Sequence, residues 1–463
     1  MVILGLTDGA EPGAALVIDG APPRWAPGPV WEAALTVSTR AGLDPGDIDV
    51  VAVAGRFTPS LAARMRGEAG RGDPFGPRSR MSARWERMLR ATGLGAMDAD
   101  AAAEWFEGQL QSRGYRPRRV RMVDLHACAS GAAYRTQPDD QTLVAVVLPR
   151  GDGAFATLHR GHSGTIERLA LEPGPNAVHL WSDRACGAVG LTDRDLALAG
   201  GAADPDPELV ARLGRTFRRE HGRFAARRLE VRAALPWADL GRLPRAVAAA
   251  TVSRVFREAA LAWLAEVAQR HPGQPLTLGG QLALDPQLVA AAAELPGVPR
   301  VWAGPWTGGA ALAVGAALTL GGRPPGLDPE GDADDEPIPD GVVVSEPDLE
   351  RLVNRLASGG AVARFVGATP GVAMSPTRAV LARADRPDAI AHARSAVRRA
   401  ETEDHLRVEL PGPAEHPLSG PLRCGLAAVD GARTGWADPG LVPVLEALRA
   451  RTGCGALAAV PLG

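Results

Sequence analysis

Apolar runs separated by turn and helix signals fill the first 54 residues, and their order constrains the fold more than any other feature of the sequence. An apolar run at 2–6 and another at 14–18 flank a turn rich in glycine, aspartate and proline at 7–13, which predicts a β-hairpin. Apolar spacing predicts a helix at about 30–42, and a buried strand follows at 47–54. A strand, a hairpin, a helix and a strand in this order are typical of an α/β layer.

Further strands and helices are predicted downstream. Buried strands are expected at 142–148 and 154–158, a long helix at 247–268 and another strand at 276–278. Residues 59–118 are polar and rich in arginine, and they are interpreted as an insertion over the core. No tandem repeat is visible in the sequence.

The acidic segment 326–341, which also contains several prolines and glycines, cannot bury a core and is interpreted as a linker. A helix is predicted after it at 346–357, and a strand at 360–366. The sequence therefore predicts a domain boundary here and a smaller α/β domain toward the C-terminus.

Composition places the chain among ordinary globular proteins and excludes several kinds of chemistry. The chain has 463 residues, 46% of them hydrophobic, which is enough for about two or three domains with large cores. All 51 basic residues are arginines, so a P-loop lysine, a Schiff-base lysine and a lysine general base are excluded. The net charge of -2 argues against a polyanion-binding surface as the main purpose, and the basic run at 116–121 is interpreted as a solvated charged face.

The cysteines and the N-terminus indicate the compartment. The 4 cysteines lack CxxC or zinc-like spacing, which fits reduced thiols and predicts no structural metal. The N-terminus lacks a basic segment followed by an apolar run, and no segment holds about 18 uninterrupted apolar residues. We therefore expect a soluble, cytoplasmic protein.

The most informative motif is Val-Asp-Leu-His-Ala-Cys-Ala-Ser-Gly-Ala-Ala-Tyr at 123–134. It resembles, without a gap, the V-D-H-H-x-A-H-A-A-S-A-Y segment of the NodU-type O-carbamoyltransferases. In that family the first and third histidines bind a metal ion, and the residues here are Leu125 and Ala129, whose side chains offer no donor electrons. Only the middle histidine remains, as His126. Metal binding in the family manner is therefore not expected.

Two interpretations of His126 are open. A lone histidine beside an apolar helix is commonly a hydrogen-bonded structural residue. The alternative is a shifted site that uses Asp124, His126 and Cys128.

The resemblance covers nearly the whole chain and implies both a fold and an activity. The family joins a TsaD-like duplicated α/β domain of the actin and sugar-kinase superfold to a YrdC-like α/β domain. The YrdC-like domain makes carbamoyl-adenylate from carbamoyl phosphate and ATP, and the TsaD-like domain transfers the carbamoyl group to a hydroxyl. The resemblance implies a TsaD-like domain at 1–325, the linker at 326–341 and a reduced YrdC-like domain at 342–463.

A second match lies at the N-terminus, where residues 3–20 resemble the family's I-L-G-I…H-D-x-x-A-A-L-V-x-D-G with one residue missing. The family's His-Asp pair falls on Ala10 and Glu11. A general base requires a titratable group, which Ala10 lacks. Glu11 is therefore the candidate catalytic residue here, and an exposed glutamate in a hairpin turn is the alternative.

Two glycine-rich segments also resemble the family. The segment 278–285 is similar to L-A-G-G-V-A-L-N, whose paired glycines let backbone amides approach a nucleotide. The segment 301–318 is similar to V-x-P-A-x-G-D-A-G-x-A-x-G-A-A-L, and the family's metal-binding aspartate corresponds to Gly309. The candidate cofactor-binding glycines are Gly279, Gly280 and Gly308.

The segment 365–381 corresponds to the family's G-R-x-E-x-G-P-R-A-L-G-x-R-S-I-L, which holds ATP and carbamoyl phosphate. Polyphosphate binding needs guanidinium groups or nests of backbone amides. Arg378 alone remains as a candidate, and the family's glutamate is absent.

Residues that build the family's fold persist, whereas residues that would contact ATP, metal or carbamoyl groups have largely gone. We therefore expect a carbamoyltransferase-like protein of bacterial secondary metabolism, such as antibiotic biosynthesis, that is catalytically degenerate and acts as a partner or scaffold subunit. Its partner would be an intact carbamoyltransferase paralogue or a second copy of itself, and no nucleic acid or membrane is expected. No cofactor is expected either, and ATP and carbamoyl phosphate would bind only if the family chemistry is retained.

Two alternatives retain catalysis. One is a metal-independent transferase with altered chemistry in an inter-domain pocket, with Glu11, Asp124 and His126 as catalytic residues and a small natural product as substrate. The other is an active O-carbamoyltransferase that transfers a carbamoyl group from carbamoyl phosphate to a hydroxyl.

Overall fold

A computed structural model describes most of residues 1–321 and shorter stretches from residue 348 onward. Within 1–321 it describes all positions except 10, 20, 22, 66–87, 89–91, 93, 138, 174–175, 192–195, 197–203, 228–230, 232–234 and 304–305. Further along it describes 348–359, 362–365, 378–383, 385–386, 388–389, 406–409, 418–419, 427–429, 432–436, 442–454 and 456–461. Among these residues no helix is long and apolar enough to cross a membrane.

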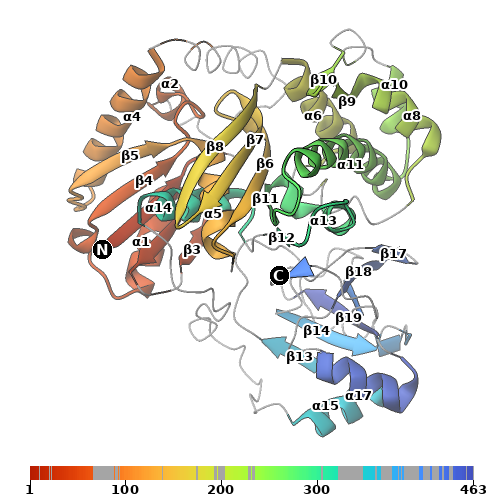
Figure 1. The fold of residues 1–463 in the computed structure, drawn as a ribbon. Coiled ribbons are helices and arrows are strands. Elements are labelled where there is room, and N and C mark those ends of the chain that lie inside the picture. The colour runs from red at the N-terminus through yellow and green to blue at the C-terminus, as the bar shows by residue number, and fades with distance from the viewer. Residues whose placement is uncertain are drawn as a thin grey trace.

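The first sheet contains the predicted hairpin. Its strands lie in the order β3-β2-β1-β4-β5 (Figure 1). The pairs β1–β2 and β2–β3 are antiparallel, whereas β1–β4 and β4–β5 are parallel. The strands are β1 (Val2–Thr7), β2 (Gly13–Ile18), β3 (Arg24–Pro27), β4 (Val50–Ala54) and β5 (Arg119–Val123).

The second sheet repeats this arrangement. Its order is β16-β12-β11-β6-β7-β8, in which β6–β7 and β7–β8 are antiparallel and β6–β11 and β11–β12 are parallel. The two halves therefore form a duplicated α/β unit, and the predicted mixed α/β class is confirmed. The strands are β6 (Thr142–Gly151), β7 (Ala154–His162), β8 (Thr165–Pro173), β11 (Leu276–Gly280), β12 (Val301–Ala303) and the added β16 (Leu418–Ser419).

Helix α4 (Leu94–Gln111) corrects the interpretation of residues 59–118 as an insertion over the core. The helix lies in the crossover between the parallel neighbours β4 and β5, and parallel strands require such a connection. Its Phe106 and Leu110 are fully buried in the same apolar cluster as Leu4 of β1. The helix is thus part of the core, together with α1 (Val30–Arg40), and the short α2 (Leu61–Met65) lies beside it.

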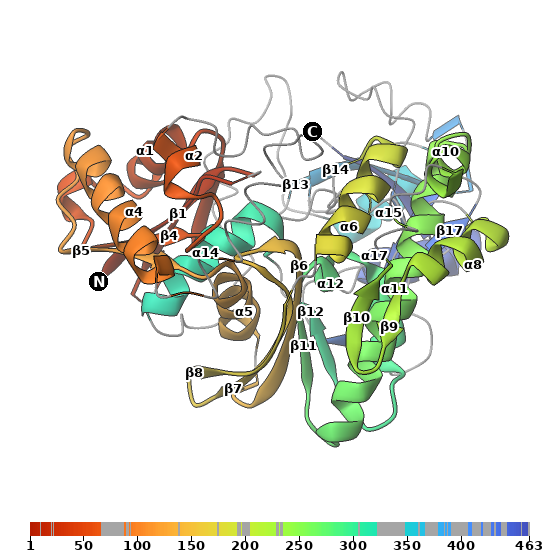
Figure 2. The ribbon, with the colours of Figure 1, turned by 90° about the horizontal axis from the view of Figure 1, so that it is seen from above.

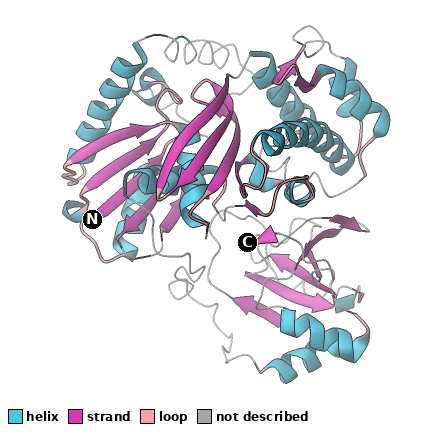
Figure 3. Cartoon of the chain, viewed as in Figure 1, coloured by secondary structure: helices cyan, strands magenta, loops and turns pink. Residues whose placement is uncertain are grey.

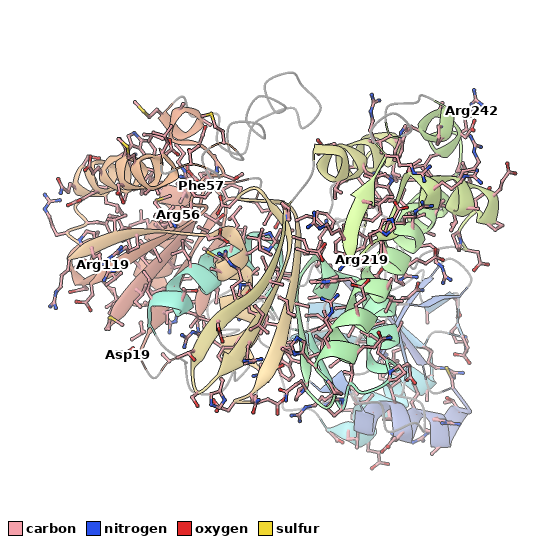
Figure 4. All side chains as sticks on the ribbon, turned by 45° about the horizontal axis from the view of Figure 1, so that its top comes forward. Asp19, Arg56, Phe57, Arg119, Arg219 and Arg242 are labelled. Atoms are coloured by element: carbon pink, nitrogen blue, oxygen red, sulfur yellow. The ribbon has the colours of Figure 1, made fainter. Side chains whose placement is uncertain are left out.

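The basic run at 116–121 leads into the edge strand β5. All four of its arginines are exposed, and Figure 4 labels Arg119 among them. Charged side chains on an edge strand hinder pairing with other chains. The predicted solvated face is therefore confirmed.

Two helices are exchanged between the halves. Helix α5 (Leu125–Thr136) follows the last strand of the first sheet but packs on β6, β7 and β11, and α14 (Gly308–Gly321) follows β12 but packs on β1, β2 and β4 (Figure 2). The two helices also cross each other at Gly131 and Gly315, and a Cβ on Gly315 would overlap the carbonyl oxygen of Cys128. The halves are therefore joined by a helix crossing that requires glycine.

The other face of the second sheet packs on a helical layer (Figure 3). Along β6, Val144 and Val146 belong to the cluster beneath α5, whereas Leu143 and Val147 belong to the cluster beneath the helices. This alternation follows from the two-residue period of a strand that is buried on both faces. The layer contains α6 (Asn176–Val189), α8 (Pro207–Thr216), β9 (Phe217–Glu220), β10 (Arg223–Ala226), α10 (Leu235–Leu240), α11 (Arg245–Arg270), α12 (Gln281–Leu284) and α13 (Pro286–Ala293).

The C-terminal part forms a third sheet in the order β13-β14-β19-β15-β18-β17, with two helices that pack on each other. The predicted helix at 346–357 and strand at 360–366 are present, with shorter bounds. The predicted linker at 326–341 lies outside the described residues. The elements are β13 (Val362–Phe365), β14 (Arg378–Arg383), β15 (Leu406–Glu409), β17 (Ala427–Val429), β18 (Ala432–Trp436), β19 (Ala456–Pro461), α15 (Leu349–Ala357) and α17 (Val442–Thr452).

Candidate functional site

Asp152 forms the turn between β6 and β7 and connects the two halves. Asp152 and Gly153 have φ values of 47° and 79°, as a two-residue type I′ hairpin turn requires. The buried Asp152 carboxylate accepts hydrogen bonds from four backbone amides of the first half. The donors are Arg56 (3.0 Å), Phe57 (2.7 Å) and Thr58 (2.8 Å) after β4, and Leu125 (2.8 Å) in the first turn of α5.

The charge of Asp152 depends on opposing effects. Burial, with a smaller contribution from the negative charge of Asp124, raises the pKa of the Asp152 carboxyl to about 6. The amides of Leu125, Phe57 and Arg56 act in the opposite direction, because they stabilise the ionised form. At neutral pH Asp152 is ionised and acts only as an acceptor.

Asp124 and His126, two predicted catalytic residues, have structural contacts. Asp124 caps α5, because its Oδ1 accepts from the amides of His126 (3.0 Å) and Ala127 (3.3 Å). His126 is buried, and its Nδ1 lies 3.0 Å from Oγ1 of Thr157 on β7. A shifted metal site with Cys128 receives no support, because the described residues contain no group of three His, Cys, Asp or Glu side chains that could hold a metal ion.

The His126 contact belongs to a series that joins α5 to β7, of which three pairs lie among the described residues. Four residues of a helix advance about 6 Å, and two residues of a strand advance about 6.8 Å. Every fourth residue of α5 can therefore face every second residue of β7. In the second pair, Oγ of Ser130 lies 2.8 Å from Nδ1 of His159. In the third, the aromatic ring of Tyr134 packs against Gly161. The pairs are His126 with Thr157, Ser130 with His159, and Tyr134 with Gly161.

His159 is neutral at physiological pH. Burial is the main cause, and the nearby positive charges of His126 and Arg168 add to it, so that the pKa of His159 falls to about 4. The Nδ1 atom of a neutral His159 ring either donates a hydrogen bond to the Ser130 hydroxyl or accepts one from it, depending on the tautomer. The Ser130–His159 contact therefore buries a neutral imidazole ring.

The positions that correspond to the family's metal-binding histidines lie in apolar cores. Leu125 packs in the cluster that contains Trp306 and Ala310, and Ala129 packs in a separate cluster with Val144. Both residues are buried. Neither side chain can donate an electron pair, and the two are directed into different apolar surroundings.

The structure brings Glu11 together with Gly308, two of the predicted site residues. Oε2 of Glu11 accepts a hydrogen bond of 2.7 Å from the amide of Gly309 in the first turn of α14. A Cβ at Gly308, where φ is 57°, would overlap the Glu11 carboxylate, and a Cβ at Gly309 would overlap the Glu11 carbonyl oxygen. A helix N-terminus favours an anion, and here the chain's own carboxylate is that anion. Ala10 lies outside the described residues.

Gly279 and Gly280 are required by packing. Gly280 has φ of 62°, and a Cβ there would overlap the carbonyl oxygen of Val147 on β6. A Cβ on Gly279 would lie 3.0 Å from Cγ2 of Val146. The packing contacts and the positive φ of Gly280 are enough to explain both glycines. Arg378, the remaining candidate, begins β14 in the C-terminal sheet and pairs with Phe365 of β13, whereas residues 366–377 are not described.

Sequence reasoning missed a buried ion pair at the end of β1. The guanidinium of Arg64 contacts Asp8 (Nε to Oδ2, 2.9 Å) and donates from Nη2 to the carbonyl oxygen of Gly55 (2.9 Å). Burial also raises the pKa of the nearby Asp98. Arg64 falls in the segment interpreted as an insertion, so no sequence signal linked it to Asp8. Asp152 had one weak signal, an Asp-Gly pair between two predicted strands.

No protein-family model and no curated protein matches the sequence. Among solved structures, the chain is similar to the ROK hexokinase from Thermus thermophilus (16% identity, 69% of this chain and 98% of that chain, TM-score 0.32). It is also similar to a putative N-acetylglucosamine kinase from Chromobacterium violaceum (14%, 69% and 98%, 0.31) and to YeaZ from Pseudomonas aeruginosa (17%, 37% and 66%, 0.21). Because all three TM-scores are below 0.5, the repeated strand order, and not these likenesses, defines the fold.

Proposed function

We propose that this chain is a carbamoyltransferase-like protein of bacterial secondary metabolism that no longer catalyses the family reaction. In this proposal it acts as a partner or scaffold subunit of an active carbamoyltransferase or of a biosynthetic complex. Its TsaD-like part would be the duplicated unit, and its reduced YrdC-like part would be the C-terminal sheet.

The observation that carries the proposal is the position of Glu11 at the N-terminus of α14. The Gly309 amide, which could otherwise donate to a bound anion, donates to Glu11 Oε2. An aspartate at position 309 would not fit, because its Cβ would overlap the Glu11 backbone. In this proposal, a contact within the chain stands where the resemblance would put the family's third metal ligand.

The other two ligand positions support the same conclusion. Leu125 and Ala129 are buried in apolar clusters, so a metal ion does not fit the residues that are present. His126 contacts Thr157 at the α5–β7 interface. No step of a reaction is therefore assigned to a metal ion in this chain.

Isothermal titration calorimetry of the full chain tests the loss of chemistry. We expect no binding of Mg-ATP, carbamoyl phosphate, Zn²⁺ or Fe²⁺ at concentrations that saturate active carbamoyltransferases. Stoichiometric binding of any one of them would contradict the proposal. The scaffold role is tested by mixing the chain with a carbamoyltransferase from the same genome and measuring the mass of the complex by analytical ultracentrifugation. An unchanged sedimentation of both proteins would reject that role.

A second candidate, an enzyme with altered chemistry, is favoured by the two neighbouring carboxylates Asp124 and Asp152. Burial and the neighbouring charge of Asp124 raise the pKa of the Asp152 carboxyl to about 6, and a carboxyl with a raised pKa suits acid–base chemistry. Asp124→Asn keeps the helix cap, because asparagine caps as well as aspartate, and removes the charge. This candidate predicts loss of pathway product for Asp124→Asn and for His126→Ala, whereas the scaffold proposal predicts unchanged product for Asp124→Asn.

A further inference from the structure

A cavity of about 250 Å³ lies on the second half, away from Glu11 and Asp152. It is bounded by β8, the β9–β10 hairpin and the C-terminal end of α11. Its apolar wall is formed by Leu158, Leu171, Trp263 and Val267. This volume is slightly below the roughly 300 Å³ at which drug-sized pockets begin, so an occupant would be a small molecule.

The polar wall of the cavity is rigid and largely neutralised. Nη1 of Arg219 contacts both oxygens of Glu172 at 2.5 and 2.7 Å, and its Nε and Nη2 contact Glu266 at 3.1 and 2.8 Å. The amide of Phe224 also donates to Glu172, at 3.1 Å. Because the Arg219 side chain is only 5% exposed, this network holds the β9–β10 hairpin against β8 and α11. Figure 4 shows Arg219 at the centre of this half.

Cations remain at the rim after this network is formed. Arg223 is exposed, and its side chain has no hydrogen bond or ion pair with any described residue. Arg270 is 66% exposed, and its one ion pair with a described residue is a contact of 3.5 Å with Glu266. The cavity is lined by Arg219, Arg223 and Arg270, which together exceed the lining Glu172 and the adjacent Glu266 by one charge. The half-buried His271 lies beside these arginines.

We propose that this cavity binds a small monocarboxylate with a flat or branched apolar body. The apolar body would pack on Trp263 and Leu171, and the carboxylate would accept hydrogen bonds from Arg223 and Arg270. A guanidinium binds a carboxylate through charge-assisted hydrogen bonds. A phosphate dianion is disfavoured, because Glu172 and Glu266 limit the surplus to a single positive charge and would repel a second negative one.

Calorimetric titration of the full chain tests this site with phenylacetate, with the uncharged phenylacetamide and with inorganic phosphate. We expect saturable binding of one phenylacetate per chain, and binding of phenylacetamide and phosphate that is weaker by about tenfold or more. Arg223→Gln should weaken phenylacetate by about tenfold or more, because it removes a charged donor. The matched control is Arg242→Gln, an exposed arginine of the same half that lies far from Arg219 (Figure 4) and should leave the affinity unchanged.

Three results would overturn the proposal. The first is the absence of saturable phenylacetate binding. The second is an equal affinity of Arg223→Gln and Arg242→Gln, and the third is phosphate binding as tight as phenylacetate binding. Leu171→Trp gives an independent reading, because its larger side chain would occupy the apolar part of the cavity. Unchanged affinity of that variant, with an unaltered circular dichroism spectrum, would also reject the site.

Discussion

Replacing Asp152 tests whether its carboxylate holds the two halves together. Asp152→Ala leaves four amides without their acceptor. The amides of Arg56 and Thr58 are partly exposed and can bind water, whereas those of Phe57 and Leu125 are buried. An unsatisfied buried donor costs about 1–3 kcal/mol, so the two buried amides predict a loss of about 2–6 kcal/mol in the free energy of unfolding.

Asp152→Asn provides a graded comparison. Each carboxylate oxygen accepts from one buried and one partly exposed amide, and asparagine keeps one of the two oxygens. The expected loss is therefore about half, roughly 1–3 kcal/mol. Asparagine also tolerates the left-handed conformation at this turn.

Urea denaturation followed by circular dichroism measures both losses. Ser163→Ala is the matched control, because Ser163 has a similar φ of 49° in the turn between β7 and β8 without binding amides of the other half. Subtracting its effect removes the cost of placing alanine in a left-handed conformation. The reasoning fails if Asp152→Ala, so corrected, loses less than about 2 kcal/mol, since each of the two buried amides should cost at least about 1 kcal/mol.

The pH dependence of stability follows from the raised pKa of Asp152. Its ordinary value is 3.8 and its value in the folded protein is about 6, so between these values the folded state holds more protons than the unfolded state. The free energy of unfolding contributed by this group therefore falls as the pH rises from about 4 to about 6. Asp152→Asn should lack this contribution. As the pH rises from about 4 to about 6, the free energy of unfolding of the variant should therefore increase relative to that of the wild type. A constant difference between the two proteins would contradict the assignment.

Three further predictions concern other parts of the fold. His159, with a pKa of about 4, should show no ring titration by NMR above pH 5, and its contribution to stability should be lost as the pH falls from about 6.5 to about 4; an inflection near 6.5 would contradict this. Gly315→Ala should lower the free energy of unfolding by about 1–3 kcal/mol because α5 and α14 must separate, whereas Gly108→Ala, a helix position with open space around it, should raise it by about 0.5–1 kcal/mol; equal effects in urea denaturation would argue against the close crossing. Glu11→Ala should free the amide of Gly309 and allow inorganic phosphate to bind there, which the wild type should not do; calorimetry that detects no difference would show that Glu11 does not block this helix terminus.

Much of the first half could be predicted from local patterns. The hairpin, the helix at 30–40 and the strand β4 agree with the predicted elements within a few residues. Local periodicity predicts such elements because it reflects which side of each element is buried. The crossover helix α4 was misinterpreted because its polar, arginine-rich surroundings hid the two positions, Phe106 and Leu110, that are fully buried.

The candidate site could be predicted less well, because its contacts join residues far apart in the chain. The pairing of Glu11 with Gly308 and Gly309 spans nearly 300 residues, and the sequence indicated only that each segment mattered separately. The capping role of Asp124 has a local signal, an aspartate before a helix, but that signal was outweighed by the resemblance to a metal site. The contacts of Asp152 with the loop after β4 have no signal in the sequence beyond an Asp-Gly turn.

Several kinds of chemistry are excluded by the amino-acid composition and by single residues alone. A chain without lysine has no lysine nucleophile, and leucine, alanine and glycine cannot bind a metal ion through their side chains wherever they are placed. The contacts that Asp152 and Glu11 make follow from the three-dimensional arrangement of the two halves. The exchange of α5 and α14 between the two sheets brings helix N-termini to carboxylates of distant turns, so that Asp152 and Glu11 become internal acceptors. Such contacts depend on the path of the whole chain, because the amides belong to one turn or loop and the carboxylates to another.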